Sequence, residues 1–124
     1  MTLIKSISGI RGTIGGRPGE NLTPDDIVKF TSAFGFWLQQ KNQGRRISVV
    51  TGRDSRTSGP VVSCLVNNTL VAMGIDVIDT GLATTPTVEV AVTGSGSAGG
   101  IIITASHNPA EWNALKLLNN RGEF

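Results

Sequence analysis

The sequence predicts a layered α/β/α domain built on a mainly parallel, mixed β-sheet. Short apolar runs rich in β-branched residues, typical of buried strands, occupy positions 47–51, 75–78 and 101–103. Between them lie segments 58–74 and 85–92, in which apolar residues recur at helical spacing. Strands that alternate with helices in this way form a sheet whose faces are covered by helices.

The first 44 residues are predicted to hold a short strand, a loop and a long helix. Residues 3–7 alternate weakly and give the strand, whereas residues 9–21 contain five glycines and a proline, so we expect a loop there. Thr23 is the expected N-cap of the helix, with Pro24 in its first position and acidic residues in its first turn. Gly44 is expected to end this helix.

Two further helices are expected in the middle of the chain. Ser58-Gly59-Pro60 opens the first of them, which ends at Gly74. We expect its apolar stripe to consist of Val61, Leu65, Thr69 and Ala72. Thr85-Pro86 repeats the signal of a cap followed by proline. The helix that follows is rich in β-branched residues, so its stability depends on packing.

The last thirty residues are expected to complete the sheet. Residues 94–100 are rich in glycine and serine and precede a strand, so we interpret them as a flexible connection and not as a dinucleotide site. Residues 114–118 are predicted to form one more strand. Residues 119–122 have turn chemistry, and a returning strand is expected to begin just before the chain ends at Phe124.

Length and composition indicate one globular domain, residues 1–124. Hydrophobic residues make up 39% and charged residues 16% of the chain. The net charge is +2, and the sequence has no run of like charges. We therefore expect no nucleic-acid partner and no membrane surface. We see no apolar leader and no membrane-spanning segment in the sequence, so the expected location is cytoplasmic. The single cysteine, Cys64, is expected to be a buried thiol in a helix.

Ser106 is the candidate nucleophile. It lies in a loop, 104–109, that follows the buried strand 101–103, and ligands gather beyond the carboxyl ends of such strands. A serine hydroxyl becomes reactive when a base takes its proton or when it already carries a phosphoryl group. His107 and Asn108 can turn toward the same pocket. Taken alone, the pattern is equally compatible with a turn in which serine and asparagine bond their own backbone.

Basic residues in neighbouring loops favour a phosphate ligand. Arg11 lies in the glycine-rich segment, Arg53 and Arg56 flank Asp54 after a predicted strand, and Lys116 follows Ser106 by ten positions. Arginine and lysine are the usual partners of phosphate oxygens. A solvated surface charge is the commoner role for any one of them, and their clustering is what favours phosphate. Histidine and cysteine occur once each and far apart, so the sequence completes no metal site.

Four motifs resemble those of the α-D-phosphohexomutases and occur in the order seen in that family. They are Ser8-Gly9-Ile10-Arg11-Gly12, Gly52-Arg53-Asp54-Ser55-Arg56, Thr85-Pro86-Thr87 and Thr104-Ala105-Ser106-His107-Asn108-Pro109, the last followed by Asn113 and Lys116. The resemblance covers essentially the whole chain. It corresponds to the N-terminal α/β domain, most closely that of a phosphoglucosamine mutase, with a phosphomannomutase or phosphoglucomutase as the alternative.

The resemblance implies a four-domain enzyme that moves a phosphoryl group between the 6- and 1-oxygens of a hexose phosphate through a hexose bisphosphate. Ser106 matches the family's phosphoserine, and His107 and Lys116 are the candidates for proton transfer. Arg11, Lys116 and Asn108 match positions that hold phosphate. The implied cofactor is Mg²⁺, which a phosphoryl oxygen on Ser106 and aspartates outside this chain would bind.

The chain departs from the family pattern in two places. Ala114 stands where the family usually has glycine, and a positive φ there would be strained. The family's aspartate triplet and sugar-specificity loop have no counterpart in this sequence, so we expect the chain to be inactive alone. By the same resemblance the last helix of the domain would follow Phe124, so we expect an uncovered apolar face and self-association. A folded module without activity is a second reading. A serine hydrolase is a third, disfavoured because Ala105 and His107 replace the glycines of a nucleophile elbow.

Overall fold

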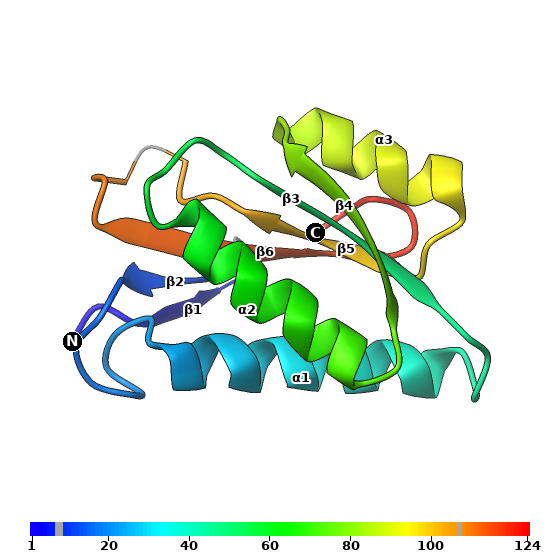
Figure 1. Ribbon diagram of the computed structural model, residues 1–124, viewed down its shortest axis with the longest axis horizontal. Helices are drawn as coiled ribbons and strands as arrows, with labels where there is room; N and C mark the ends of the chain where they lie inside the picture. The colour runs from blue at the N-terminus through cyan, green and yellow to red at the C-terminus, as the bar shows by residue number, and fades with distance from the viewer. Residues whose placement is uncertain (7–8, 107) are drawn as a thin grey trace.

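A computed structural model describes residues 1–6, 9–106 and 108–124. Within them lies one mixed sheet with strand order β1-β2-β6-β5-β3-β4 (Figure 1). The elements in chain order are β1 (Ile4–Ser6), β2 (Gly9–Thr13), α1 (Pro24–Lys41), β3 (Ser48–Arg53), α2 (Gly59–Ala72), β4 (Asp76–Leu82), α3 (Thr85–Ser95), β5 (Gly99–Ile103) and β6 (Trp112–Leu118). The predicted α/β/α class with a mixed sheet is confirmed.

The sheet has a parallel half and an antiparallel half. Strand β3 pairs in parallel with both β4 and β5, and helices α2 and α3 make the connections between these strands. Strands β5, β6, β2 and β1 then pair antiparallel, each with the next. Parallel pairing brings the carboxyl ends of β3 and β5 to the same edge of the sheet, and the loops that follow them lie at one end of the molecule (Figure 1).

The predicted loop over residues 9–21 is wrong in its first part, because Gly9–Thr13 forms β2 inside the sheet. The glycines that suggested a loop permit close approach of backbones. A Cβ added at Gly9, whose φ is +111°, would clash with the carbonyl oxygen of Leu115 on β6. A Cβ at Gly12 would lie 3.0 Å from the backbone nitrogen of Leu22. Glycine within a strand often marks such an approach.

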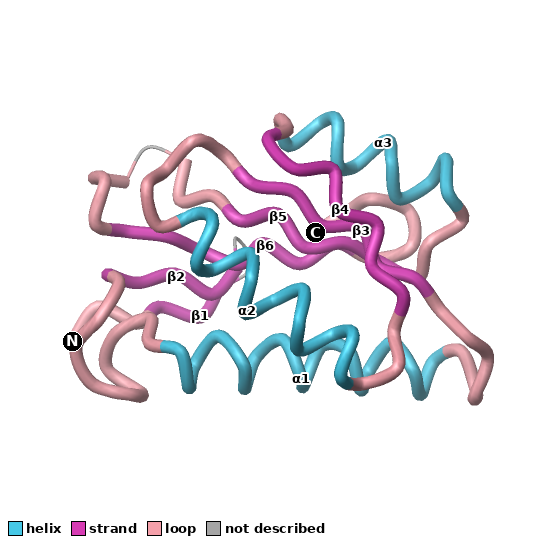
Figure 2. The backbone as a smooth tube through the Cα atoms, in the orientation of Figure 1, coloured by secondary structure: helices cyan, strands magenta, loops and turns pink. Residues whose placement is uncertain are grey.

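Helices cover both faces of the sheet, as the tube view in Figure 2 also shows. On one face, α1 and α2 pack on side chains of alternate strand positions such as Val49, Ile101 and Ile103. On the other face, α3 buries Val88 and Val92 against the sheet. Their partners there are Val50, Ile102 and Leu118. The strands of the centre are therefore apolar on both sides, which explains their continuous apolar runs.

Helix α2 turns a different stripe toward the core from the predicted one. Val62, Val66 and Leu70 are buried, whereas Val61 is 63% exposed. Apolar residues occur in adjacent pairs along this helix, so two stripes one residue apart fit the helical period equally well. Cys64 lies on the outer side and is exposed, so the prediction of a buried thiol is also wrong.

Local capping chemistry sets the start of α1, as predicted. The carboxylate of Asp26 accepts hydrogen bonds from the backbone N–H of Thr23 (3.1 Å), from the Thr23 hydroxyl and from the N–H of Gly19 (3.0 Å). Helix α3 begins one residue earlier than the cap signal suggested, because Thr84 is its N-cap and accepts from the N–H of Thr87. In the part of the chain that the structure describes, no helix combines the length and apolarity needed to cross a bilayer.

Candidate active site

Two loops meet at the carboxyl edge of the sheet. The Ser106 loop, defined as residues 104–111 together with Trp112, the first residue of β6, follows β5, and a loop of residues 54–58 follows β3. Arg53 at the end of β3 is in register with Ile103 at the end of β5, and the N–H of Asp54 donates to the carbonyl oxygen of Ile103 (3.1 Å). The sheet therefore fixes both loops side by side.

Ser106 lies at the surface of its loop with its hydroxyl against a lysine. The ammonium nitrogen of Lys116 lies 2.6 Å from Ser106 Oγ. Lys116 is on β6, opposite Ile102 on β5, so its position comes from the sheet. Ser106 has a φ of +52°, which is uncommon for a residue other than glycine. A cation at this distance would stabilise negative charge on the serine oxygen or on a phosphoryl group attached to it.

Arg56 uses all of its hydrogen-bond donors within the protein. Its guanidinium has five N–H groups, and the structure gives a partner to each. Nε donates to the Asp54 carboxylate at 3.2 Å, and the two terminal nitrogens donate to four backbone carbonyl oxygens. These carbonyls belong to Ser106 (2.8 Å), Asn108 (2.8 Å), Pro109 (2.7 Å) and Trp112 (3.1 Å). Arg56 therefore contacts the Ser106 loop along most of its length.

Asp54 connects Arg56 to the end of β5. Its carboxylate accepts from the hydroxyl of Thr104 (2.5 Å) and from the backbone N–H of Arg56 (3.1 Å), in addition to Arg56 Nε. The Thr104 hydroxyl in turn accepts from the N–H of Ser106 (3.2 Å). Sequence reasoning did not single out Thr104 for this role. The signal available was its place, two residues before Ser106 and directly after a buried strand.

The remaining predicted site residues are Arg11, Asn108 and His107. Arg11 on β2 is opposite Ala114 on β6, so it shares the face of the sheet that Lys116 occupies two positions along. Its Nε is buried and has no hydrogen-bond partner among the described residues. Asn108 is half-buried and its N–H donates to the carbonyl of Ala105 (3.0 Å). His107, the other predicted site residue, lies outside the described residues.

Asn113 and Ala114 hold β6 against the rest of the site. Buried Asn113 donates from its side-chain nitrogen to the hydroxyl of Ser58 (2.9 Å), which joins β6 to the start of α2. Ala114 is paired with Arg11 and takes no positive φ, because its place in β6 fixes extended backbone. The strain considered for alanine at this position is therefore absent.

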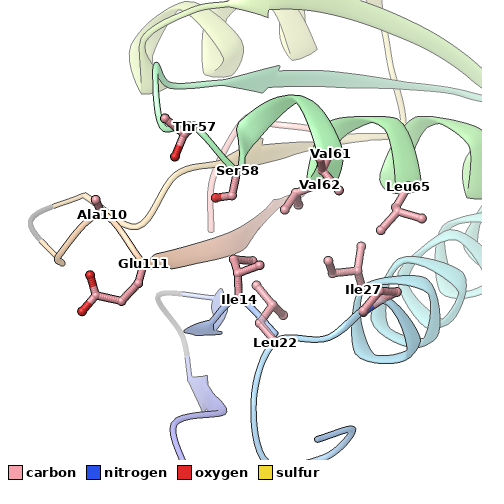
Figure 3. A pocket seen from close by; sticks show the side chains of 11 residues that line it. Ile14, Leu22, Ile27, Thr57, Ser58, Val61, Val62, Leu65, Ala110 and Glu111 are labelled. Carbon is pink, nitrogen blue, oxygen red and sulfur yellow. The ribbon is translucent and has the colours of Figure 1, made fainter. Parts of the chain in front are cut away.

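An apolar groove lies beside the exit of the Ser106 loop (Figure 3). It has a volume of about 390 Å³ and lies between the first turns of α1 and α2. Ile14, Leu22, Ile27 and Leu65 line it, and Glu111 stands at its edge (Figure 3). Neither Ser106 nor Lys116 lines this groove, so it is separate from the polar site.

Comparison with known proteins agrees with this fold. Residues 3–124 match the family model described as "Phosphoglucomutase/phosphomannomutase, alpha/beta/alpha domain I". A phosphoglucomutase/phosphomannomutase of Thermococcus kodakarensis is 42% identical over 113 residues, which are 90% of this chain and 25% of that protein. A phosphoglucosamine/phosphogalactosamine mutase of Sulfurisphaera tokodaii is 35% identical over 114 residues, which are 92% of this chain and 23% of that protein.

Solved structures give the same result. The crystal structure of a provisionally named phosphomannomutase from Thermus thermophilus superposes with a TM-score of 0.84 at 27% identity, over 98% of this chain and 26% of that one. Fold and motifs thus define an α/β/α domain of the phosphohexomutase class. The chain belongs to the phosphoglucomutase/phosphomannomutase family and matches its domain I. It spans about a quarter of the length of the curated relatives described above.

Proposed function

We propose that this chain is the phosphoserine domain of a phosphohexomutase and that Ser106 carries the phosphoryl group. The observation that carries the proposal is the contact between Ser106 Oγ and Lys116 Nζ at 2.6 Å, at the carboxyl edge of a sheet in a chain of this family. In the proposed reaction the bond between phosphorus and Ser106 Oγ breaks while a hexose hydroxyl oxygen bonds to phosphorus. The reverse step returns the other phosphoryl group of the resulting hexose bisphosphate to Ser106.

The residues of this chain would supply charge and position. Transfer of a phosphoryl group needs neutralisation of its oxygens and in-line placement more than it needs covalent chemistry. Lys116 is in place to stabilise charge on Ser106 Oγ when that oxygen is the leaving group. Arg11, on the same face and with no partner for its Nε among the described residues, is proposed as the second cation for the phosphate oxygens. Proton transfer is proposed for His107 and Lys116: a neutral His107 could take the hydroxyl proton of the sugar, and the Lys116 ammonium could give a proton to Ser106 Oγ as that oxygen leaves. Asn108 is proposed as a phosphate contact.

Family membership implies a metal-dependent mutase, and we propose Mg²⁺. The described residues bring no group of three or more His, Cys, Asp or Glu side chains together. Asp54, the acid beside the Ser106 loop, is engaged by Thr104 and Arg56. The metal ligand that this chain fits is therefore a phosphoryl oxygen on Ser106, and the other ligands would come from outside it. When bound, the ion would neutralise charge on the transferred group.

The proposed substrates are hexose phosphates, with glucosamine phosphate preferred and mannose or glucose phosphates as the alternative. The names of the relatives cover amino sugars and neutral sugars alike, so they support the class more than the particular sugar. Because the chain spans a quarter of those proteins, we propose that it has no turnover by itself. The other reading, a folded module without activity, is separated from this one by adding the remaining domains and measuring turnover.

The test is the variant Ser106→Ala in the full-length mutase that carries this chain as its first domain. Incubation with a hexose bisphosphate followed by mass spectrometry of peptides should place one phosphoryl group on Ser106 in the native protein. The variant should carry none and should lose nearly all mutase turnover. Ser32→Ala, on helix α1, is the matched control and should keep both. Substantial turnover by Ser106→Ala would overturn the proposal.

A further inference from the structure

Four carbonyl oxygens of the Ser106 loop converge on the side chain of Arg56. They come from residues spread between positions 106 and 112, and all four accept hydrogen bonds from Arg56. We propose that Arg56 is a positioning residue that holds the phosphoryl-carrying loop in its reactive shape, and that it does not bind phosphate itself. This inference rests on the proposed function of Ser106.

The donor arrangement separates Arg56 from the phosphate-binding cations. Each of its five N–H groups already has an acceptor within 3.2 Å. Its side chain is 11% exposed, so a phosphate oxygen would have to displace one of these carbonyl acceptors to reach it. Lys116 is different, because its one described partner is the Ser106 hydroxyl itself. Arg56 therefore bonds the backbone of the loop, whereas Lys116 bonds the oxygen that reacts.

Apart from Arg56, the described backbone bonds between the loop and the rest of the chain lie near its ends, at Thr104 and Glu111. Its described internal backbone bonds are short-range, from the N–H of Asn108 to the carbonyl of Ala105 and from the N–H of Trp112 to the carbonyl of Pro109. Converging carbonyl dipoles repel one another unless a cation lies between them. Ser106 also takes a positive φ that a non-glycine residue leaves readily when its surroundings allow. Arg56 supplies such a cation, because its guanidinium bonds carbonyl oxygens from Ser106 to Trp112.

The placement of Arg56 is itself fixed by the sheet. Asp54 accepts from Arg56 Nε and from the backbone N–H of Arg56, and its own N–H bonds the carbonyl of Ile103 at the end of β5. Thr104 bonds the same carboxylate and receives the N–H of Ser106. Asp54, at the end of β3, thus fixes the guanidinium through Nε, and the two terminal nitrogens bond the Ser106 loop.

The inference predicts an effect on turnover and not on substrate binding. If Arg56 only orients the loop, its loss lowers the fraction of enzyme with Ser106 in line for transfer, so kcat falls while KM stays near its native value. A phosphate ligand would instead raise KM for the sugar phosphate. Lysine keeps the charge but has three donors on one nitrogen, and it cannot match a planar fork that bonds five acceptors.

The experiment compares Arg56→Lys and Arg56→Ala with Arg46→Ala in the full-length mutase. Arg46 also bonds an aspartate, Asp76, but it lies at the opposite end of the sheet. We expect Arg56→Lys to lower kcat by about 10- to 100-fold at nearly constant KM, and Arg46→Ala to leave both unchanged. Millimolar guanidinium should restore part of the kcat of Arg56→Ala, because a free guanidinium ion can occupy the vacated site, and should not affect Arg46→Ala.

Hydrogen exchange of the amides gives a second reading that does not depend on turnover. In the Arg56→Lys protein, amides of residues 105–112 should exchange faster, whereas those of β5 should keep their native rates. Faster exchange throughout the sheet would instead mean general destabilisation and would overturn the proposal. So would native kcat in Arg56→Lys and Arg56→Ala, or a rise in KM without a fall in kcat. Turnover retained by Ser106→Ala would overturn the proposed function, whereas the exchange rates of the loop amides would still show whether Arg56 holds the loop.

Discussion

The two ends of the sheet each carry an arginine bonded to an aspartate, and the pairs differ in everything except that chemistry. At the amino end of β4, Arg46 makes a two-pronged pair with Asp76, at 2.7 and 2.8 Å. At the carboxyl end of β3, Arg56 reaches Asp54 at 3.2 Å. By distance alone the first pair is the better one. Yet its side chains are 78% and 50% exposed, whereas Arg56 is 11% exposed and also bonds four backbone carbonyls.

The surroundings of an ion pair, more than its geometry, therefore decide how much the pair contributes to stability. An exposed pair exchanges hydration for a contact of similar free energy and contributes little to stability. The pair of Arg56 and Asp54 is different, because Arg56 also bonds the Ser106 loop. Removing one partner would leave polar groups there without hydrogen bonds. The hydrogen bond from Arg46 lowers the pKa of Asp76, but a lowered pKa in an exposed group is a local effect. The consequences of the Arg56 pair extend to Ser106.

The largest expected effect in this comparison is on Asp54. Asp54→Asn replaces a charged acceptor that serves the Thr104 hydroxyl, the Arg56 N–H and Arg56 Nε. Hydrogen bonds to charged groups are worth more than neutral ones, so we expect a loss of about 2 kcal/mol in the free energy of unfolding. Urea denaturation of the chain measures it. Asp76→Asn is the matched control and should leave the midpoint unchanged. Equal losses in the two variants would contradict the comparison.

Local chemistry explains which parts of the fold could be predicted from the sequence. The start of α1 depends on Thr23, Pro24 and Asp26, which are neighbours in the chain, and it lies where the sequence placed it. The buried strands β3 and β5 are likewise apolar runs that need no distant partner to be recognised. Strand β2 was missed because the role of Gly9 depends on the carbonyl of Leu115, more than a hundred residues away.

The candidate site shows the same division. Ser106 and Lys116 are ten positions apart and their contact was expected from the motif. The task of Arg56 was not, since sequence alone suggested a phosphate partner. Its four carbonyl acceptors lie 50 to 56 positions further along the chain, and only the parallel pairing of β3 with β5 brings them within reach. Carbonyl acceptors also leave no mark in a sequence, because every residue has one.

A third acid, Asp26, is buried at the start of α1 and is held by hydrogen bonds instead of an ion pair. Burial raises its pKa, but hydrogen bonds from the Thr23 side chain, the Thr23 backbone and the Gly19 backbone outweigh burial, so the pKa is lower than its ordinary value of 3.8. A lowered folded pKa gives stability that is present above pH 3.8 and is lost as the pH falls through the folded value. We expect Asp26→Asn to cost about 1 kcal/mol near neutral pH, the typical value of a helix cap.

The test for Asp26 is urea denaturation of native and Asp26→Asn proteins between pH 7 and pH 2. The difference in free energy of unfolding should stay constant down to about pH 4 and shrink below it, as the native carboxylate takes up its proton. Asp25→Asn, an exposed neighbour in the same helical turn, controls for the helix dipole. A difference that persists unchanged at pH 2 would mean that the cap acts through shape and not through charge.

Salt should affect the exposed pair of Arg46 and Asp76 only slightly, through the pKa of Asp76. Salt shortens the Debye length from about 10 Å at 0.1 M to about 3 Å at 1 M, and exposed charges feel that screening fully. The pKa of Asp76, which the hydrogen bond from Arg46 and its charge hold low, should therefore rise in 1 M salt, and it should rise further in Arg46→Gln, with little dependence on salt. NMR titration of the Asp76 carboxyl carbon measures both shifts. Because Arg46 and Asp76 are both exposed, their interaction contributes little to stability, and Arg46→Gln should move the midpoint of urea denaturation much less than Asp54→Asn does. A clear loss of stability in Arg46→Gln would show that exposure is a poor guide to the contribution of this pair, and the contrast with Arg56 would then have to rest on its carbonyl bonds alone.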